Sequence, residues 1–139
     1  MLTKHPGKRT YTLTLTEGQA LVLRDACELL ARVHMGQFDS VVDEVVLHRT
    51  GWTDIIWKAR EIASELERAV FPHGLSISSA DIPDRSRVAW DLYQVVRGAI
   101  AWADVPPGVP RPSWHVQYDD PMHTSEAEPL ARCDVDDAG

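Results

Sequence analysis

The sequence predicts an α+β protein in which about four helices pack on a small antiparallel sheet in a single domain. Three observations support this fold class. Apolar residues recur at helical spacing in four stretches, and a short segment near each end alternates between apolar and polar residues as a β-strand does. In addition, a chain of 139 residues with 44% hydrophobic residues has the size and composition of one domain with its own core.

The first predicted elements are a strand and a helix. Residues 11–16 read Tyr-Thr-Leu-Thr-Leu-Thr, an alternating pattern rich in β-branched residues, and we expect Leu13 and Leu15 to face the core. Thr16 and Gln19 have the spacing of a capping box, in which each side chain bonds the backbone N–H of the other residue. We therefore expect a helix to begin after Thr16 and to end near Gly36.

Two further helices follow in the central part of the chain. Residues 37–48 predict a short helix, although four valines weaken its helical propensity. Gly51 interrupts the pattern, and Thr53 is the expected cap of a third helix. This third helix has an apolar stripe with charges opposite, which predicts packing against the rest of the domain. The stripe consists of Ile55, Ile56, Ala59, Ile62, Ala63, Leu66 and Val70.

The last part of the chain predicts one long helix between two short strands. Residues 75–77 are expected to form a strand, and the pair Asp81 and Pro83 marks the start of a helix over residues 84–102. Four prolines and a glycine between residues 105 and 112 predict a loop. Residues 114–118 alternate again and predict a strand that pairs with the first one.

The charge distribution divides the chain into three regions. Residues 119–139 contain seven acidic residues and one arginine, so this segment carries −6 of the net charge of −7. We expect a flexible N-terminus over residues 1–10, one ligand-binding domain over residues 11–125, and an acidic, disordered tail over residues 126–139.

Composition excludes several classes of protein. No stripe of lysine and arginine suits duplex nucleic acid, and no apolar run has the roughly 18 residues of a membrane span. The first ten residues lack the apolar stretch of a signal peptide. Cys27 belongs to a predicted helix and Cys133 to the tail. Their spacing is not that of a metal site, and we expect no disulfide between them. We therefore predict a cytoplasmic protein.

Catalytic and metal-binding signatures are missing from the sequence. The glycine-rich phosphate loops, the zinc-protease motif and the nucleophile elbow are all absent, and the six histidines are scattered. We predict no cofactor and no metal site. Tyr93 and Arg97 share one side of the long helix, where a ring and a guanidinium can stack on a base and bind a phosphate. They can equally form the ordinary polar rim of an amphipathic helix.

Three segments resemble a family of small bacteriophage proteins. They are Met35-Gly36-Gln37-Phe38, the run from Arg87 to Arg97 with Ala101-Trp102, and Asp120-Pro121-Met122-His123-Thr124-Ser125. In their order along the chain they resemble the phage anti-Thoeris sponge family, the first described type of Thoeris anti-defence protein. The resemblance covers roughly residues 11–130, and the Asp-Leu-Tyr-Gln-Val run is its most distinctive part.

The resemblance implies a function without catalysis. Such proteins capture the cyclic ADP-ribose isomers that bacterial TIR-domain proteins make as alarm signals, and they hold the messenger intact, so that Thoeris immunity stays off in the infected host. Members assemble as dimers or homohexamers with pockets between subunits, and some also hold cyclic di- and trinucleotides of CBASS defence. The resemblance leaves open which isomer is bound and how many chains assemble.

The resemblance also implies site residues. Tyr93 matches an aromatic that stacks on the ligand, Arg97 and Thr124 belong to the matching runs, and Arg68 matches a further basic contact. The chain departs from the family at His123, where an arginine is expected, and at Ala103, where an asparagine is expected.

Two other functions stay open at this point. The first is an enzyme that cleaves a cyclic nucleotide messenger, for which Asp119, Asp120 and His123 are the local candidates for acid–base chemistry. The second is an inhibitor that docks its acidic tail on a host protein. Recovery of the unaltered ligand separates the first from a sponge, and deletion of the residues after Ser125 separates the second.

Overall fold

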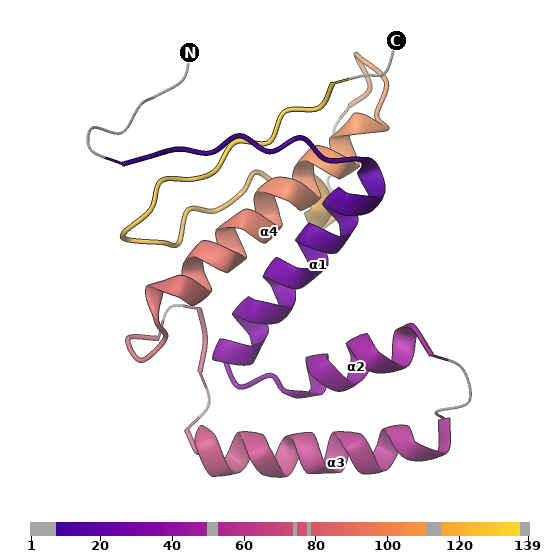
Figure 1. Cartoon of the computed structure of the whole chain (residues 1–139), viewed down its shortest axis with the longest axis vertical. Coiled ribbons are helices and arrows are strands. Elements are labelled where there is room, and N and C mark those ends of the chain that lie inside the picture. The colour runs from indigo at the N-terminus through magenta and orange to yellow at the C-terminus, as the bar shows by residue number, and fades with distance from the viewer. Residues whose placement is uncertain (1–7, 50–52, 74, 78, 111–114, 137–139) are drawn as a thin grey trace.

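The computed structural model describes residues 8–49, 53–73, 75–77, 79–110 and 115–136. These residues contain four α-helices, α1 (Glu17–His34), α2 (Asp39–Leu47), α3 (Thr53–Val70) and α4 (Asp84–Ala103), and one 3-10 helix, η1 (Val116–Tyr118). Helices α1 and α4 pack along each other, α2 follows α1, and α3 lies beyond α2 (Figure 1). No residue in the described ranges belongs to a β-strand. The α+β prediction is therefore wrong, and the fold is all-α.

Both ends of α1 agree with the sequence. Thr16 Oγ1 accepts a hydrogen bond from Gln19 N at 3.3 Å, and Thr16 N donates to Gln19 Oε1 at 2.9 Å, so the capping box is confirmed. The helix ends at His34, and Gly36 adopts a φ of 77°, a left-handed conformation that favours glycine. An added Cβ at Gly36 would lie 2.6 Å from Phe71 Cδ2. Glycine is thus required for both conformation and space.

The core lies between α1 and α4, where small side chains let the two helices approach closely. Ala31 and Ser86 are fully buried, and Ala89 is nearly so. Ser86 Oγ donates a hydrogen bond of 3.1 Å to the carbonyl oxygen of Ala31, which satisfies this buried hydroxyl group. Other buried apolar side chains of this part of the fold are Met35, Ile82, Val95 and Val96.

The remaining helices follow the predicted order with small changes at their ends. Helix α2 spans Asp39–Leu47, and α3 begins at Thr53 itself, which was predicted to be the cap before its first residue. Pro83 is the N-cap of α4, with a ψ of 146°, and therefore lies just before the first helical turn that was predicted to contain it. Phe38 and Phe71 stack at a centroid distance of 6.0 Å and join the start of α2 to the end of α3.

The sheet is missing because its expected strands have no partners in the described ranges. Residues 11–16 are extended, but Tyr11 is 84% exposed and Leu13, expected in the core, is 70% exposed. In place of the strand over 114–118, residues 116–118 form η1 with local bonds such as Tyr118 N to His115 O at 3.1 Å, and Trp114 is outside the described residues. The segment 75–77 forms no strand either. An unpaired strand gains no interstrand hydrogen bonds and is not stable alone.

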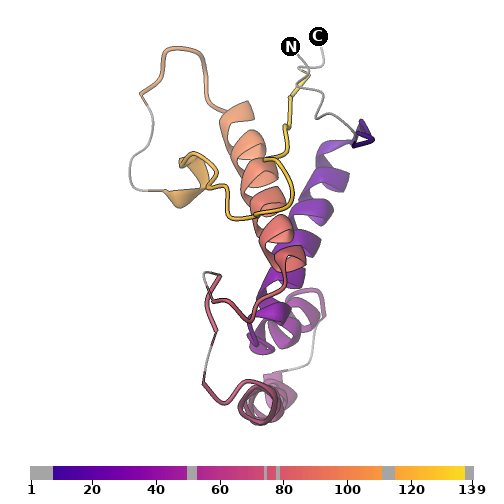
Figure 2. The ribbon, with the colours of Figure 1, turned by 90° about the vertical axis from the view of Figure 1, so that its left-hand side faces the viewer.

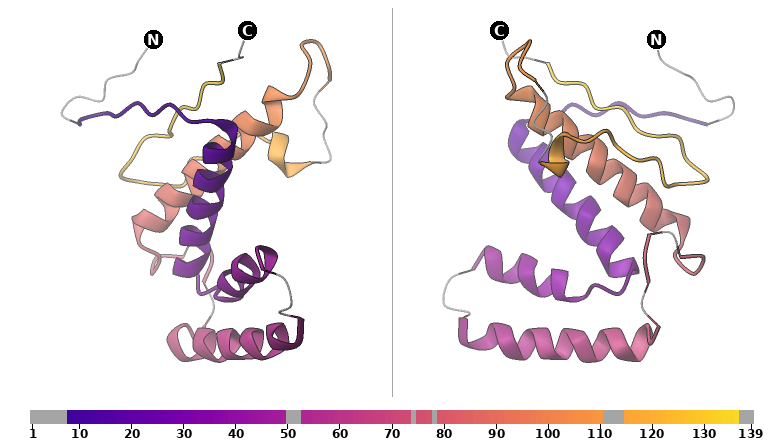
Figure 3. Two further views of the ribbon diagram at one scale, coloured as in Figure 1. Left: turned by 45° about the vertical axis from the view of Figure 1, so that its right-hand side comes forward. Right: turned by 180° about the vertical axis from the view of Figure 1, so that it is seen from behind.

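The N-terminal segment contacts the C-terminal segment beside α4. Lys8 Nζ donates to the carbonyl oxygen of Ala127 at 2.8 Å and pairs with Glu128 at 2.9 Å. Figure 3 shows the N-terminal segment and the C-terminal segment running past the α1–α4 pair at the end away from α3. Over the described residues, no helix is both long and apolar enough to cross a membrane.

Candidate functional site

Four side chains form a row in which positive groups and aromatic rings alternate. The Arg32 guanidinium lies 5.7 Å from the centroid of the Trp90 ring, and the Trp90 and Tyr93 rings are 5.2 Å apart. The Arg97 guanidinium lies 4.9 Å from the centroid of Tyr93. These distances suit cation–π and aromatic contacts. We call Arg32, Trp90, Tyr93 and Arg97 the cation–aromatic row.

Helical geometry explains why three members of this row share one strip of α4. At 3.6 residues per turn, Trp90, Tyr93 and Arg97 follow one another by one turn each. Ser86 lies one turn before Trp90 on the same strip, and there it contacts α1 through the carbonyl oxygen of Ala31. Arg32 reaches the strip from α1 because these two helices pack along each other. The row therefore depends on the tertiary contact and not on α4 alone.

Two buried hydrogen-bond donors of the row have no acceptor. Among the described residues, neither the indole Nε1 of Trp90 nor the Nε of Arg97 has a hydrogen-bond partner, although both atoms are shielded from solvent. Leaving a buried donor unpaired costs about 1–3 kcal/mol. Arg97 also donates from Nη1 to Tyr93 Oη over a long 3.4 Å. An oxygen of a phosphate or a carbonyl group can accept from such donors, and it reaches these two only when the side chains that shield them move.

Arg32, in contrast, is already engaged. Its guanidinium forms an ion pair with Glu28 at 2.9 Å, one turn earlier on α1, and donates to Gln37 Oε1 at 2.7 Å. No carboxylate of the described residues lies within ion-pair distance of Arg97. The row thus has one neutralised cation and one available cation.

A second feature of α4 is a segment pinned across it. Residues 119–128, which we call the strap, cross α4 (Figure 2). The buried Asp91 carboxylate accepts hydrogen bonds from Thr124 N at 2.8 Å, Ser125 N at 2.9 Å and Thr124 Oγ1 at 2.6 Å. Gln94 exchanges two bonds with the backbone of Met122, of 3.1 and 3.4 Å. Because Asp91 and Gln94 lie on one face of α4, their bonds fix the register of the strap along this helix.

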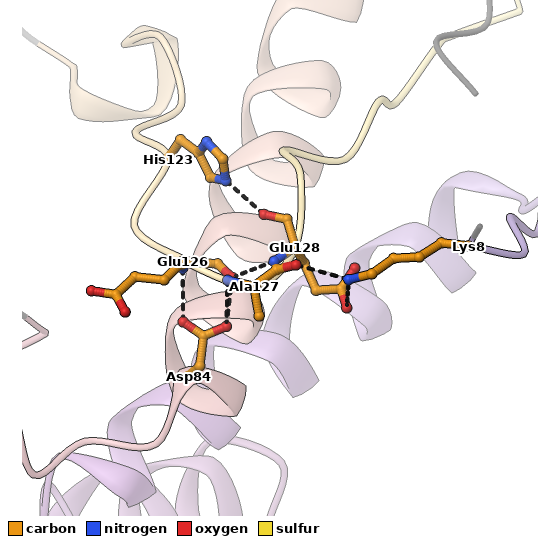
Figure 4. A network of polar contacts seen from close by, with 7 residues as sticks. Lys8, Asp84, His123, Glu126, Ala127 and Glu128 are labelled. Atoms are coloured by element: carbon orange, nitrogen blue, oxygen red, sulfur yellow. Dashed lines mark hydrogen bonds and ion pairs between the residues drawn. The ribbon is translucent and has the colours of Figure 1, made fainter. Parts of the chain in front are cut away.

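Asp84 holds the next part of the strap, from Ser125 to Ala127 (Figure 4). Its carboxylate accepts from Ser125 Oγ at 2.7 Å, Glu126 N at 2.9 Å and Ala127 N at 3.2 Å. The Glu126 N–H above all, then the Ser125 hydroxyl, hold the pKa of the Asp84 carboxyl below its ordinary value. Desolvation opposes this shift, and the Ala127 N–H and the positive Arg87 add to it.

The strap uses the two site residues that it was predicted to supply. Thr124 donates its backbone N–H and its hydroxyl hydrogen to the Asp91 carboxylate. His123 Nε2 lies 2.7 Å from the carbonyl oxygen of Glu128. Since a carbonyl only accepts, this nitrogen carries the hydrogen. Both residues therefore contribute to the closure of the strap in the chain as it stands.

The other predicted site residues lie apart. Arg68 is on α3, which among the helices contacts only α2, so it does not reach Tyr93 within one chain. Ala103 ends α4, about 9 Å along the axis from Arg97 at 1.5 Å per residue. There it lines an open groove of about 520 Å³ together with Trp102, Pro106 and Cys133. The structure therefore brings together Tyr93 and Arg97, and not the full predicted set.

Sequence reasoning missed four residues that matter here. Trp90 precedes Tyr93 by three positions on a helix, a spacing that could have identified it. Asp91 and Gln94 could have been suspected because they place polar groups on the buried side of a helix. Arg32 gave no signal, because its position over Trp90 follows only from the packing of α1 on α4.

Metal ligands do not gather in the part of the chain that the structure describes, where no three histidine, cysteine, aspartate or glutamate residues form a possible metal site. Comparison with known proteins adds no assignment. No family model matches the chain, and neither a curated protein nor a solved structure is similar to it.

Proposed function

We propose that this chain is a non-catalytic binding protein that sequesters a small phosphorylated nucleotide messenger. The observation that carries the proposal is the cation–aromatic row, with its unpaired donors on Trp90 and Arg97. The resemblance to the anti-Thoeris family specifies the ligand class as cyclic ADP-ribose isomers, with cyclic di- and trinucleotides as further candidates. The biological role is then the suppression of Thoeris or CBASS signalling in an infected bacterium.

The chemistry of the row matches a ligand that has both phosphate and base. A guanidinium has five donors in a fixed plane, and Arg97 uses one of them, weakly, on Tyr93. The remaining donors can form the charge-assisted bonds that a diphosphate accepts. The Trp90 and Tyr93 rings offer apolar surface and π-faces for a base, which contribute about 1–3 kcal/mol per stacked base.

The contacts of one chain do not supply the binding free energy that a sponge needs. A useful sponge needs a Kd near 1 nM, or about −12 kcal/mol. One stacked base and two charge-assisted hydrogen bonds at about 1.5–3 kcal/mol each supply roughly 4–9 kcal/mol. Association itself costs several kcal/mol. A second chain that closes over the row supplies the missing contacts, so self-assembly is part of the proposal.

One ring nitrogen of His123 is engaged within the strap. A messenger-cleaving enzyme needs a base or nucleophile, and His123 was the local histidine candidate. Its Nε2 carries a hydrogen and donates to Glu128 at 2.7 Å, so this nitrogen is not an available base while the strap is closed. The unpaired groups of the row are donors, which bind an anion but do not remove a proton from it.

Calorimetry with paired arginine variants tests the proposal. Arg97→Ala should weaken the binding of a cyclic ADP-ribose isomer at least tenfold, because it removes the available cation of the row. Arg85→Ala is the matched control, since Arg85 is an exposed arginine of the same helix, outside the row, and its loss should change Kd less than twofold. Equal effects of the two substitutions would contradict the proposed site.

Two aromatic variants separate the contributions of the rings. Tyr93→Ala should also weaken binding at least tenfold, because Arg97 loses the ring that supports it. Trp90→Phe keeps an aromatic ring but removes the indole N–H. If that N–H serves the ligand, binding weakens while the fold persists by circular dichroism; unchanged affinity would remove Trp90 from the site.

A further inference from the structure

Helix α3 presents an uncovered apolar seam. Ile55, Ile62, Leu66 and Val70 are 52%, 55%, 49% and 52% exposed, although each lies on the stripe that the sequence predicted to be in the core. Ile55, Ala59, Ile62 and Leu66 follow each other at intervals of four, three and four residues, which is the spacing of a coiled-coil seam. We call these four residues the α3 seam.

The described residues cover this seam only in part. Helix α2 packs on a neighbouring face of α3, where Ala63 is buried and Arg60 pairs with Asp43 of α2 at 2.7 Å. Among the helices, α3 contacts only α2. Figure 1 shows α3 as the outermost helix, with α2 between it and the α1–α4 pair. The seam therefore lies beside the face that α2 covers, and its three large side chains stay about half exposed.

We propose that the α3 seam binds the same seam of a second copy of this chain, with the two helices antiparallel. The flanking charges support a self-complementary contact. Lys58 and Glu65 lie on the same side of the seam, one on either side of Ile62 along the helix. A two-fold axis close to Ile62 brings Lys58 of each copy toward Glu65 of the other. In a parallel, in-register pair, Lys58 of one copy and Glu65 of the other lie on opposite sides of the interface and do not meet.

The exposed area of the chain is larger than that of a compact monomer of the same mass. A compact monomer of 15.6 kDa exposes about 7,250 Å². This chain exposes 10374 Å², an excess of about 3,100 Å² over that expectation. A stable interface needs roughly 800 Å² from each partner. The extended segments before α1 and after the strap account for part of the excess, and the α3 seam offers an apolar area that a second copy can bury.

This inference does not depend on the proposed nucleotide function, because α3 carries no member of the cation–aromatic row. The two surfaces are separate. A protein that uses the seam for one contact and closes the row with another assembles into more than two chains. Loss of one contact then leaves the other measurable.

Light scattering of the purified full chain at micromolar concentration tests the seam. Wild-type protein should have at least twice the monomer mass of 15.6 kDa, and Ile62→Glu should reduce the observed mass by half or more. The matched control is Trp57→Glu, since Trp57 is 72% exposed on the same helix but outside the seam. This variant should keep the wild-type mass. A monomeric wild type, or equal effects at both positions, would overturn the proposal.

A charge exchange keeps the test decisive if Ile62→Glu fails to fold. Lys58→Glu should raise the dissociation constant of the contact at least tenfold, and Lys58→Glu combined with Glu65→Lys should restore it, with circular dichroism confirming the helical fold in each case. No rescue by the double variant would show that the antiparallel seam is wrong. Cyclic nucleotide binding by the same variants distinguishes failure of this inference from failure of the proposed function.

Discussion

Replacement of Asp91 by alanine tests whether the strap is held by one buried carboxylate. Asp91 is 3% exposed, and it accepts hydrogen bonds from two backbone N–H groups and one hydroxyl of Thr124 and Ser125. The substitution Asp91→Ala removes the only group that these three bonds share. The donors must then either stay buried without an acceptor or reach solvent by lifting the strap from α4.

The two responses set the size of the effect. A hydrogen bond to a charged group contributes about 1.5–3 kcal/mol, so three of them sum to at least roughly 4 kcal/mol if the strap stays in place. If the strap lifts, water satisfies the donors, and the loss is limited to the free energy of docking the strap. We therefore expect Asp91→Ala to lower the free energy of unfolding by about 2–4 kcal/mol, a large share of the 5–15 kcal/mol typical of domains.

Urea unfolding measures this loss, and amide hydrogen exchange locates it. Exchange at Thr124 and Ser125 should accelerate in Asp91→Ala before global unfolding. Asp134→Ala is the control, because Asp134 forms an exposed ion pair with Arg132, and such pairs contribute about 0–1 kcal/mol. A change below about 0.5 kcal/mol for Asp91→Ala would refute the reasoning, since changes of that size are ordinary for surface positions.

Two further predictions concern the ends of α1 and the Asp84 anchor of the strap. Gly36→Ala should lower the free energy of unfolding by about 2 kcal/mol or more, because it forces a side chain into a left-handed backbone and places its Cβ 2.6 Å from Phe71. Gly18→Ala should raise it by up to about 1 kcal/mol, since an added Cβ there meets nothing within 4 Å; equal signs in thermal unfolding would contradict this account. The lowered pKa of Asp84 contributes stability above the unfolded pKa of about 4, and this contribution is lost as pH falls through the folded value. Asp84→Asn should therefore flatten the fall in stability below about pH 4, and an unchanged acid titration would exclude the role of Asp84.

Local signals in the sequence correctly predicted the helices. The Thr16 and Gln19 capping box and the Gly36 terminus are short-range features, and the structure contains both. Helix α4 begins and ends within one residue of its predicted limits. Such features are predictable because the residues that decide them are neighbours in the chain.

The sheet was wrong because alternation alone does not provide a partner strand. Leu13 belongs to the best β-pattern in the chain, yet it is 70% exposed in an extended segment. The seam of α3 was read correctly as apolar, but the sequence cannot say whether an apolar stripe is buried within one chain or between two. Periodicity identifies the face and not its occupant.

Only the part of the candidate site that lies within one helix was predictable from the sequence. Tyr93 and Arg97 are one helical turn apart, and the structure places them in contact at 4.9 Å. Arg32 joins them only through the packing of α1 on α4, and the anchoring of Thr124 by Asp91 links positions 33 residues apart. Contacts between residues so far apart along the chain have no local signature in one sequence.

The measurement that tests the central claim most directly is capture and release. Purified protein is incubated with a mixture of cyclic ADP-ribose isomers, linear ADP-ribose and cyclic dinucleotides, washed, and heated, and the released compounds are identified by mass spectrometry. The account predicts that one cyclic ADP-ribose isomer is retained and returned intact, and that Arg97→Ala retains much less of it. Retention of no nucleotide, or release of a hydrolysed product, would contradict it.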